Sequence, residues 1–168
     1  IIAQDGTKLL LLSQDVLDCQ PYNYSDSSST WEESSIRKWL NGSSFYEKAF
    51  SKDEKIIILS TNVQTPANPE YKTSGGEDTN DKVFLLSIDE VEEYIHAGKY
   101  GTDEMARSCD ATQYAKSLKD KNGEQLLYVK PVSDGSSLTH VAWWLRNRGN
   151  HPDTAAYVDH NGIITNLG

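Results

Sequence analysis

Aromatic and hydrogen-bonding side chains suited to binding a ligand are concentrated near the end of the sequence. From position 144 to position 161, amide, guanidinium, imidazole, carboxylate and aromatic groups alternate with turn-forming residues. Recognition surfaces favour such side chains because they provide contact area and hydrogen bonds at a modest cost in conformational entropy. We therefore predict a ligand-binding strip, with a solvated loop as the alternative, at Trp144, Arg146, Asn147, Arg148, Asn150, His151, Asp153, Tyr157, Asp159, His160 and Asn161.

The sequence carries none of the common signatures of a catalytic site. It lacks a G-x-S-x-G nucleophile elbow, a Walker-type phosphate loop and a C-x-x-C pair. Its serines and aspartates could form a triad with one of four histidines, but such combinations arise by chance. We therefore expect no catalytic residue; the histidines are His96, His140, His151 and His160.

One cluster has the residue types of a metal site. His151, Asp153, Asp159 and His160 could ligate a cation, but no pair of histidines four residues apart on a helix supports them. No D-x-D-x-D-G calcium loop occurs either. We expect polar turn residues that face water, and neither a metal nor a cofactor.

Length and charge exclude several classes of protein. The 168 residues include 25 acidic and 16 basic ones, a formal net charge of −9, and suit a single domain over residues 1–168. An acidic chain lacks the clustered Lys and Arg that neutralise phosphates, so we exclude nucleic acid as a partner. The apolar runs at 9–12 and 56–59 are shorter than the roughly 18–20 residues that cross a bilayer, so we expect no membrane insertion.

The elements that position these residues are short. Capping patterns predict a helix after Thr30 with Ile36, Trp39 and Leu40 in the core, a helical turn after Ser51, and a helix after Ser87. A further short helix is expected to start at Asp110.

Apolar runs predict strands at 9–12, 56–59, 83–86, 126–129, 141–145, 155–158 and 163–165. The first should be buried on both faces. In the strand at 141–145, the period of two separates Trp143 from Trp144, so at least one of them should lie in the core. Residues 62–80 form a long polar loop of the kind that is functional or disordered. The fold class is α+β, with short helices on small, mostly antiparallel sheets and a loop-rich C-terminal third.

The two cysteines, Cys19 and Cys109, leave two possibilities open. The chain is long enough to bury a core without disulfides, so one bridge and two buried free thiols are both compatible with the sequence.

Six blocks of sequence occur in order along nearly the whole chain: LDCQPYN (17–23), WE (31–32), SIRKWLN (35–41), DKVFLLS (81–87), TQYA (112–115) and WWLR (143–146). Together they resemble a bacterial family, domain of unknown function 6273. The last block resembles the family's W-W-L-R-S-P-G motif, although Asn147, Arg148 and Gly149 stand where the family has Ser-Pro-Gly. The family's closing G-V-R-P-A-L strand is not matched before Gly168, so a terminal strand is expected to be missing unless the chain continues.

The resemblance implies a protein secreted by, or on the surface of, Gram-positive and gut bacteria, with a fold similar to C-type lectins and formylglycine-generating enzymes. The late segment is also similar to the variable region of retroelement-diversified proteins of that fold. Because no cysteine follows Cys109, the catalytic cysteines of formylglycine-generating enzymes have no counterpart.

We therefore expect a non-catalytic, extracellular or cell-surface module that binds a glycan or a protein surface. Two alternatives remain. One is a hydrolase or oxidoreductase with a scattered Ser/His/Asp site under the 62–80 loop as a lid, because catalytic residues favour loops on rigid scaffolds. The other is a structural spacer in a larger surface protein.

Overall fold

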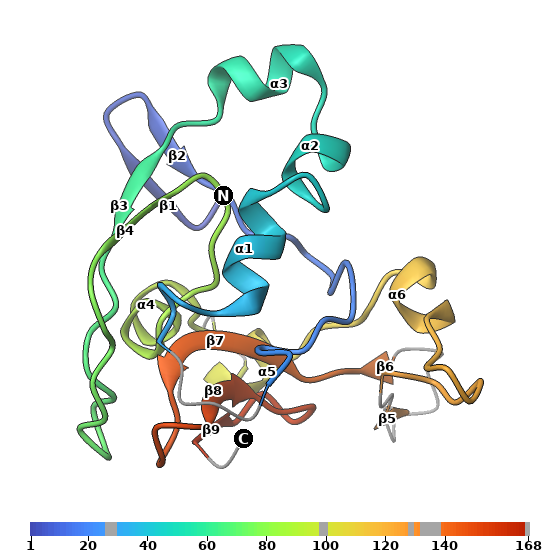
Figure 1. Ribbon diagram of the computed structural model, residues 1–168. Helices are drawn as coiled ribbons and strands as arrows, with labels where there is room; N and C mark the ends of the chain where they lie inside the picture. The colour runs from blue at the N-terminus through green and yellow to red at the C-terminus, as the bar shows by residue number, and fades with distance from the viewer. Residues whose placement is uncertain (26–29, 98–100, 128–129, 132–138, 167–168) are drawn as a thin grey trace. The chain divides into compact units, whose positions relative to one another are not determined.

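The computed structural model describes residues 1–25, 30–97, 101–127, 130–131 and 139–166. Short helices accompany sheets of two or three strands, and the pairs β1–β2, β3–β4, β5–β6 and β8–β9 are antiparallel (Figure 1). The predicted α+β class is confirmed. The helices are α1 (Ser35–Asn41), α2 (Tyr46–Ala49), α3 (Lys52–Ile57), α4 (Ile88–Tyr94), α5 (Asp103–Arg107) and α6 (Gln113–Ser117). The strands are β1 (Ala3–Asp5), β2 (Lys8–Leu10), β3 (Thr61–Val63), β4 (Thr79–Asp81), β5 (Lys130–Pro131), β6 (Thr139–His140), β7 (Trp143–Arg148), β8 (Ala155–Val158) and β9 (Ile164–Thr165).

The chain forms two compact units, each built from separate stretches of sequence. Unit 1 contains Ile1–Cys19, Asp89–Trp143 and Tyr157–Thr165. Unit 2 contains Gln20–Ile88, Trp144–Ala156 and the residues that follow Thr165. The chain passes between the units within β7 and within β8. A single domain over 1–168 stays a prediction, and each unit is described by itself.

The core of unit 2 surrounds helix α1. Ile36 and Leu40 lie one helical turn apart on its buried face, where they pack with Tyr22, Trp31 and Ala155. The predicted helix is confirmed, but its cap is not Thr30: the Ser34 side chain accepts the backbone N–H of Arg37 at 3.2 Å. Thr30 lies in the turn that precedes this cap and is buried.

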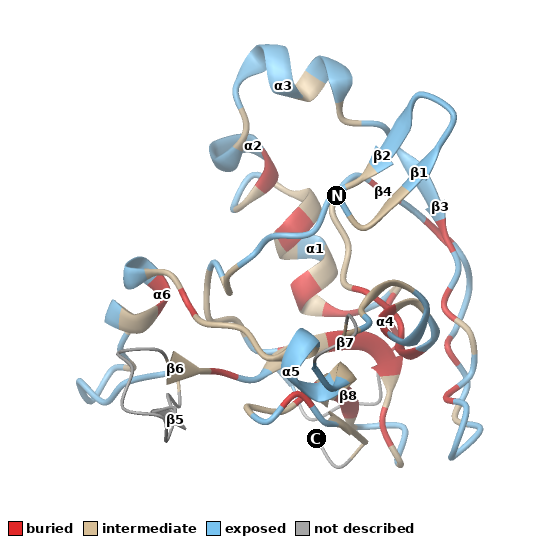
Figure 2. Cartoon of the chain, turned by 180° about the vertical axis from the view of Figure 1, so that it is seen from behind, coloured by how far each residue is buried: buried red, intermediate tan, exposed pale blue. Residues whose placement is uncertain are grey.

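The prediction of a strand at 56–59 is wrong. The predicted cap at Ser51 is present as a full capping box with Glu54, and the helix that it starts, α3, continues to Ile57. A started helix adds a hydrogen bond with each further residue, so it runs into the apolar stretch. Ile56 and Ile57 are 78% and 74% exposed, and Figure 2 shows most of α3 as exposed.

Residues 83–86 do not form a strand; Val83, Phe84 and Leu85 are half-buried and Leu86 is buried. Side chains bond much of their backbone: Asn41 Nδ2 donates to the carbonyl of Val83 at 2.8 Å, and Arg146 Nη1 to that of Leu85 at 2.8 Å. The carbonyl of Leu86 accepts the backbone N–H of Arg146, in β7, at 3.0 Å. The side chains of Val83, Phe84 and Leu85 still pack on the core, as their apolar character predicts.

In unit 1, the run at 9–12 is not a buried strand. β2 pairs with β1 in a two-stranded hairpin whose turn contains Gly6 at φ 58°. No third strand joins this sheet among the described residues, and Leu9 and Leu11 are 50% and 68% exposed. An isolated hairpin cannot cover both of its own faces.

A second small core in unit 1 joins Ala111 and Ala115 to Val141. The helix predicted to start at Asp110 starts three residues later, at Gln113, because Thr112 caps α6 by accepting the N–H of Ala115 at 3.2 Å. Asp110 instead pairs with Lys116 at 2.7 Å.

The remaining strand and helix predictions have mixed outcomes. α4 begins directly after Ser87, and β8 occupies the predicted residues 155–158. β7 starts two residues later and ends three residues later than the predicted 141–145, and β9 covers part of 163–165. The strand at 126–129 falls partly outside the described residues, and its described part, Leu126 and Leu127, is not in a strand.

The two thiols are free. Val16 and Ala111 form a parallel β-bridge. Cys19 lies three residues after Val16, whereas Cys109 lies two residues before Ala111, so the two cysteines are not opposite each other. Their offset in register opposes a disulfide, which needs Cα atoms within about 7 Å.

Candidate functional site

Arg146 of the predicted strip is buried, at 2% exposure, and its guanidinium holds the backbone of unit 2 together. Nε and Nη2 donate to the carbonyl of Gln64 at 3.0 and 2.7 Å, and Nη1 donates to that of Leu85 at 2.8 Å. The planar fork of arginine suits two carbonyl groups on different segments. Arg146 is therefore inaccessible to an external ligand and acts as a structural connector.

Asn147 is fully buried and connects two further segments. Its Oδ1 accepts the N–H of Ile88 at 2.8 Å, and its Nδ2 donates to the carbonyl of Pro66 at 3.1 Å. Satisfying both groups matters because a buried polar atom without a partner is costly. Asn147 therefore also has a structural role.

The polar loop predicted at 62–80 is shorter, because its two ends pair as part of β3 and β4. The loop between these strands is held at several points by the residues that follow Asn147. Asn68, which is fully buried, donates from Nδ2 to the carbonyl of Arg148 and to Oδ1 of Asn166, at 2.7 Å each. Thr73 Oγ1 donates to the carbonyl of Gly149 at 2.8 Å. A loop bonded in this way is an ordered part of unit 2 and lacks the freedom of a lid.

The two neighbouring tryptophans have different surroundings. Trp144 packs on the core of unit 2, edge-on to Tyr22 with ring centroids 5.9 Å apart, and its indole N–H donates to the carbonyl of Gln20 at 3.1 Å. Within unit 1, the indole N–H of Trp143 donates to the carbonyl of Arg107 at 3.1 Å. Both are half-buried.

Burial raises the pKa of the Tyr22 hydroxyl well above its usual range, although Arg148 and Arg146 lower it in part.

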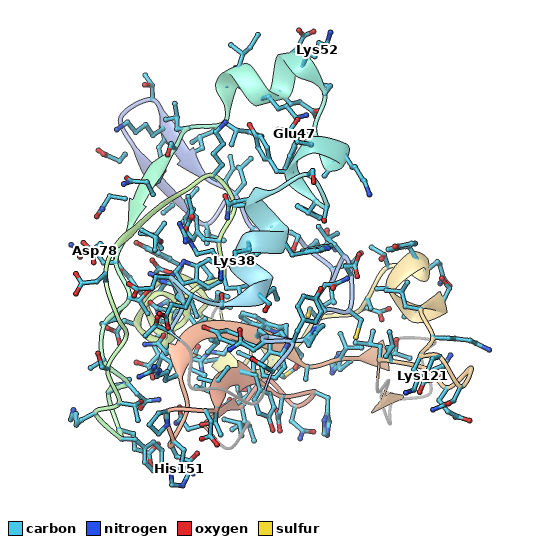
Figure 3. All side chains as sticks on the ribbon, in the orientation of Figure 1. Lys38, Glu47, Lys52, Asp78, Lys121 and His151 are labelled. Atoms are coloured by element: carbon cyan, nitrogen blue, oxygen red, sulfur yellow. The ribbon has the colours of Figure 1, made fainter. Side chains whose placement is uncertain are left out.

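The next candidates lie in the loop between β7 and β8, in unit 2. His151 and Asp153 are exposed, and Asn150 is half-buried (Figure 3 labels His151). Thr154 Oγ1 accepts the N–H of His151 at 3.1 Å and lies 2.9 Å from its carbonyl oxygen, so the loop is a compact turn. These side chains are accessible.

The last candidates belong to the β8–β9 hairpin of unit 1. Asp159 Oδ1 accepts the N–H groups of Asn161 and Ile163 at 2.8 and 2.9 Å, and Gly162 takes φ 80°. Burial raises the pKa of Asp159. These hydrogen bonds, the Asn161 side chain and the charge of His160 together lower the pKa by more than burial raises it, so the net shift is downward. Tyr157 and His160 are half-buried.

The same turn occurs a second time in unit 1, at D-K-N-G. Asp120 Oδ1 accepts the N–H groups of Asn122 and Glu124 at 2.8 and 2.9 Å, and Gly123 takes φ 86°. The repeated D-x-N-G pattern therefore marks a turn type, and it indicates a structural role for Asp159 and Asn161. In the described part of the chain, no three His, Cys, Asp or Glu residues lie close enough together to hold a metal ion.

An open pocket of about 290 Å³ lies in unit 2 and was not predicted. We call it the α1 pocket; its lining residues are Tyr24, Ser35, Lys38, Trp39 and Ser44. Three of these share one face of α1, since positions 35, 38 and 39 have the i, i+3, i+4 spacing. Lys38 is labelled on this helix in Figure 3.

The walls of the α1 pocket are held in place by the local chain. The backbone N–H of Tyr24 donates to Ser35 Oγ at 3.3 Å, and that of Ser35 to Asn23 Oδ1 at 2.9 Å. The Trp39 ring lies 4.9 Å from that of Phe45. Tyr24 itself is 71% exposed.

Trp39 was predicted to lie in the core with Ile36 and Leu40, and the structure corrects this in part. Its indole is half-buried, because position 39 lies at the edge of the helix face that Ile36 and Leu40 define. In the sequence, Ser35 stands three positions before Lys38 and four before Trp39, and this spacing could have indicated an exposed helix face. Tyr24, which comes from a different segment, could not have been added to it from the sequence.

The described chain is thus an α+β protein with small antiparallel sheets and an aromatic-lined pocket on a short helix. It belongs to the family described as domain of unknown function (DUF6273), whose model matches residues 6–168. No curated protein and no solved structure matches the chain. In the part that the structure describes, none of the helices has the length and apolar character needed to span a membrane.

Proposed function

We propose that this chain is a non-catalytic, extracellular ligand-binding module that binds a saccharide in the α1 pocket. The observation that carries the proposal is the pocket itself, which two aromatic residues, Tyr24 and Trp39, line together with two serines. Ligand sites typically combine apolar or aromatic walls with a few placed polar groups.

Saccharides suit this combination of groups. One face of a sugar ring carries C–H groups that pack on an aromatic ring, and its edge carries hydroxyl groups that exchange hydrogen bonds with serine hydroxyls. The volume of about 290 Å³ lies near the lower end for ligand sites, so it favours one terminal sugar ring over a long buried chain.

The local order of the α1 pocket supports binding. The Tyr24–Ser35 and Asn23–Ser35 hydrogen bonds and the Trp39–Phe45 contact fix its walls before a ligand arrives. A preformed site loses less conformational entropy on binding.

The finer parts of the proposal concern scaffold and location. We propose a C-type-lectin-like scaffold on the bacterial surface or in the secreted fraction, with glycans or glycosylated protein surfaces as partners. These proposals rest on the family's motifs, of which WWLR at 143–146 is one.

A glycan array probed with the purified chain tests the function. Tyr24→Ala removes an exposed wall of the α1 pocket and should weaken binding at least about tenfold, as loss of an aromatic contact predicts. Tyr114→Ala is the matched control, because Tyr114 is 59% exposed on α6 and does not line the pocket. Equal binding by Tyr24→Ala and the unaltered chain would remove the pocket from the proposal.

The accessible part of the predicted strip is a rival site for the same function. The double variant His151→Ala, Asp153→Ala removes two exposed side chains of the β7–β8 loop, and Tyr157→Ala tests the β8 position. Loss of binding in these variants, with Tyr24→Ala unaffected, would move the site to the strip. Absence of binding to any glycan would favour the spacer alternative.

A further inference from the structure

We propose that the α1 pocket selects saccharides that carry a carboxylate, such as uronic acids, and that the Lys38 ammonium binds this group. The inference rests on the proposed function, since it assumes that the pocket binds a sugar. Its starting point is charge: Lys38 is the single charged residue among the pocket's lining residues, although the chain as a whole carries −9.

The Lys38 ammonium is available to a ligand. Nζ donates one hydrogen bond, to the carbonyl of Glu33 at 2.8 Å, and within the described residues it forms no ion pair. An ammonium has three donors, so two are left for a carboxylate. The bond to Glu33 also holds the charge near the start of α1.

Two other lysines of unit 2 have partners that Lys38 lacks. Lys55 Nζ pairs with Glu47 at 2.7 Å, and Lys82 Nζ lies 4.5 Å from the centre of the Tyr46 ring. Glu32, near Lys38 in sequence, has its carboxylate bonded to the N–H of Glu77 at 2.6 Å. Among the described residues, no acidic side chain therefore pairs with Lys38.

The position of Lys38 fits a sugar acid. Lys38 and Trp39 are adjacent on α1, and Ser35 lies one turn before them, so these three residues line the same volume. In a uronic acid the carboxylate projects from the edge of the ring. A ring packed on the aromatic walls can therefore direct its carboxylate to Nζ while its hydroxyl groups reach the serines.

The test measures binding of three probes to the full chain by titration calorimetry: glucuronic acid, its methyl ester and glucose. The ester keeps the shape of the acid and removes its charge. Because hydrogen bonds between charged groups are about twice as strong as neutral ones, we expect the acid to bind about tenfold more tightly than the ester. This preference should fall as salt rises.

Lys38→Met keeps the aliphatic stem and removes the charge, so it should abolish the preference: the variant should bind the acid and the ester with equal affinity. Lys48→Met is the matched control, because Lys48 is exposed on α2 and does not line the pocket. Thermal melts confirm that both variants fold.

Three results would overturn the inference. Equal binding of acid and ester by the unaltered chain would reject carboxylate selection and leave saccharide binding in place. A preference that persists in Lys38→Met would reject Lys38 as its source. If the chain binds none of the three probes and no glycan on the array, the proposed function is rejected together with the inference.

Discussion

The indole N–H of Trp31 donates to Oδ2 of Asp81 at 3.0 Å, and both residues are almost fully buried in unit 2. The same carboxylate accepts Nε of Arg37 at 2.8 Å and the hydroxyl of Thr79 at 2.6 Å. The bonds join the turn before α1, the helix itself and strand β4. A buried carboxylate with this many donors fixes the relative positions of these segments, and α1 carries the pocket.

Asp81→Ala should lower the free energy of unfolding by about 3 kcal/mol, because it leaves the Arg37 charge and the Trp31 N–H without their buried partner. Glu47→Ala is the control, since it removes a carboxylate from the more exposed Lys55 pair and should cost less than about 1 kcal/mol. Urea titration measures both. Equal effects of the two substitutions would contradict the role assigned to Asp81.

Asn147→Ala should destabilise the chain by about 2–3 kcal/mol, because the N–H of Ile88 and the carbonyl of Pro66 would lose their partner in a buried site. Asn62→Ala, at an exposed position of β3, should change the stability by less than about 0.5 kcal/mol. If Asn147 instead contacts ligand, glycan binding will fall while the urea midpoint stays unchanged.

The Cys109 thiol should react slowly with alkylating reagents. Burial, then the charges of Asp15 and Asp110, raise its pKa to about 11 from an ordinary value of 9.0. The thiolate is the reactive form, so at pH 8 the rate should be about a hundredfold below that of an exposed cysteine. Iodoacetamide labelling of Cys19→Ser, which isolates Cys109, measures this rate.

The same pKa predicts a loss of stability in base. The folded-state pKa of Cys109 is raised above the unfolded value, so its contribution is fully present below about pH 9 and is lost as the pH rises toward 11. Cys109→Ser should flatten the fall in melting temperature over this range. An identical pH profile in the variant would show that the thiol is not buried as described.

Asp159 should titrate below an ordinary aspartate. Burial alone would raise its pKa, but the hydrogen bonds from the backbone of Ile163 and Asn161 lower it on balance. Its contribution to stability is therefore present above about pH 4 and lost as the pH falls through the folded-state pKa. NMR titration of the carboxyl carbon checks the shift, and Asp159→Asn should reduce the acid dependence of the melt.

Local patterns in the sequence were sufficient where structure depends on neighbours along the chain. The capping box at Ser51 and Glu54 and the apolar spacing of Ile36 and Leu40 both predicted helices that form. The D-x-N-G pattern at Asp159 likewise agrees with the expectation of a polar turn. Each depends on contacts within about four residues.

Predictions failed where side chains from distant segments supply hydrogen bonds to the backbone. Residues 83–86 have the composition of a strand, but the side chains of Asn41 and Arg146 bond their backbone groups. Arg146 and Asn147 have the polar character of surface residues, yet both are buried because carbonyl groups from the 62–80 loop complete their hydrogen bonds.

The sequence by itself therefore determined the α+β class, the family, the helix starts at Ser51 and Ser87, and the net acidic charge. Tertiary structure decided which polar groups are buried connectors and which are accessible. It also brought Tyr24 beside Trp39 and Lys38. The physical reason is that a side chain's exposure depends on the partners that distant segments supply, and residue type and local spacing do not encode those partners.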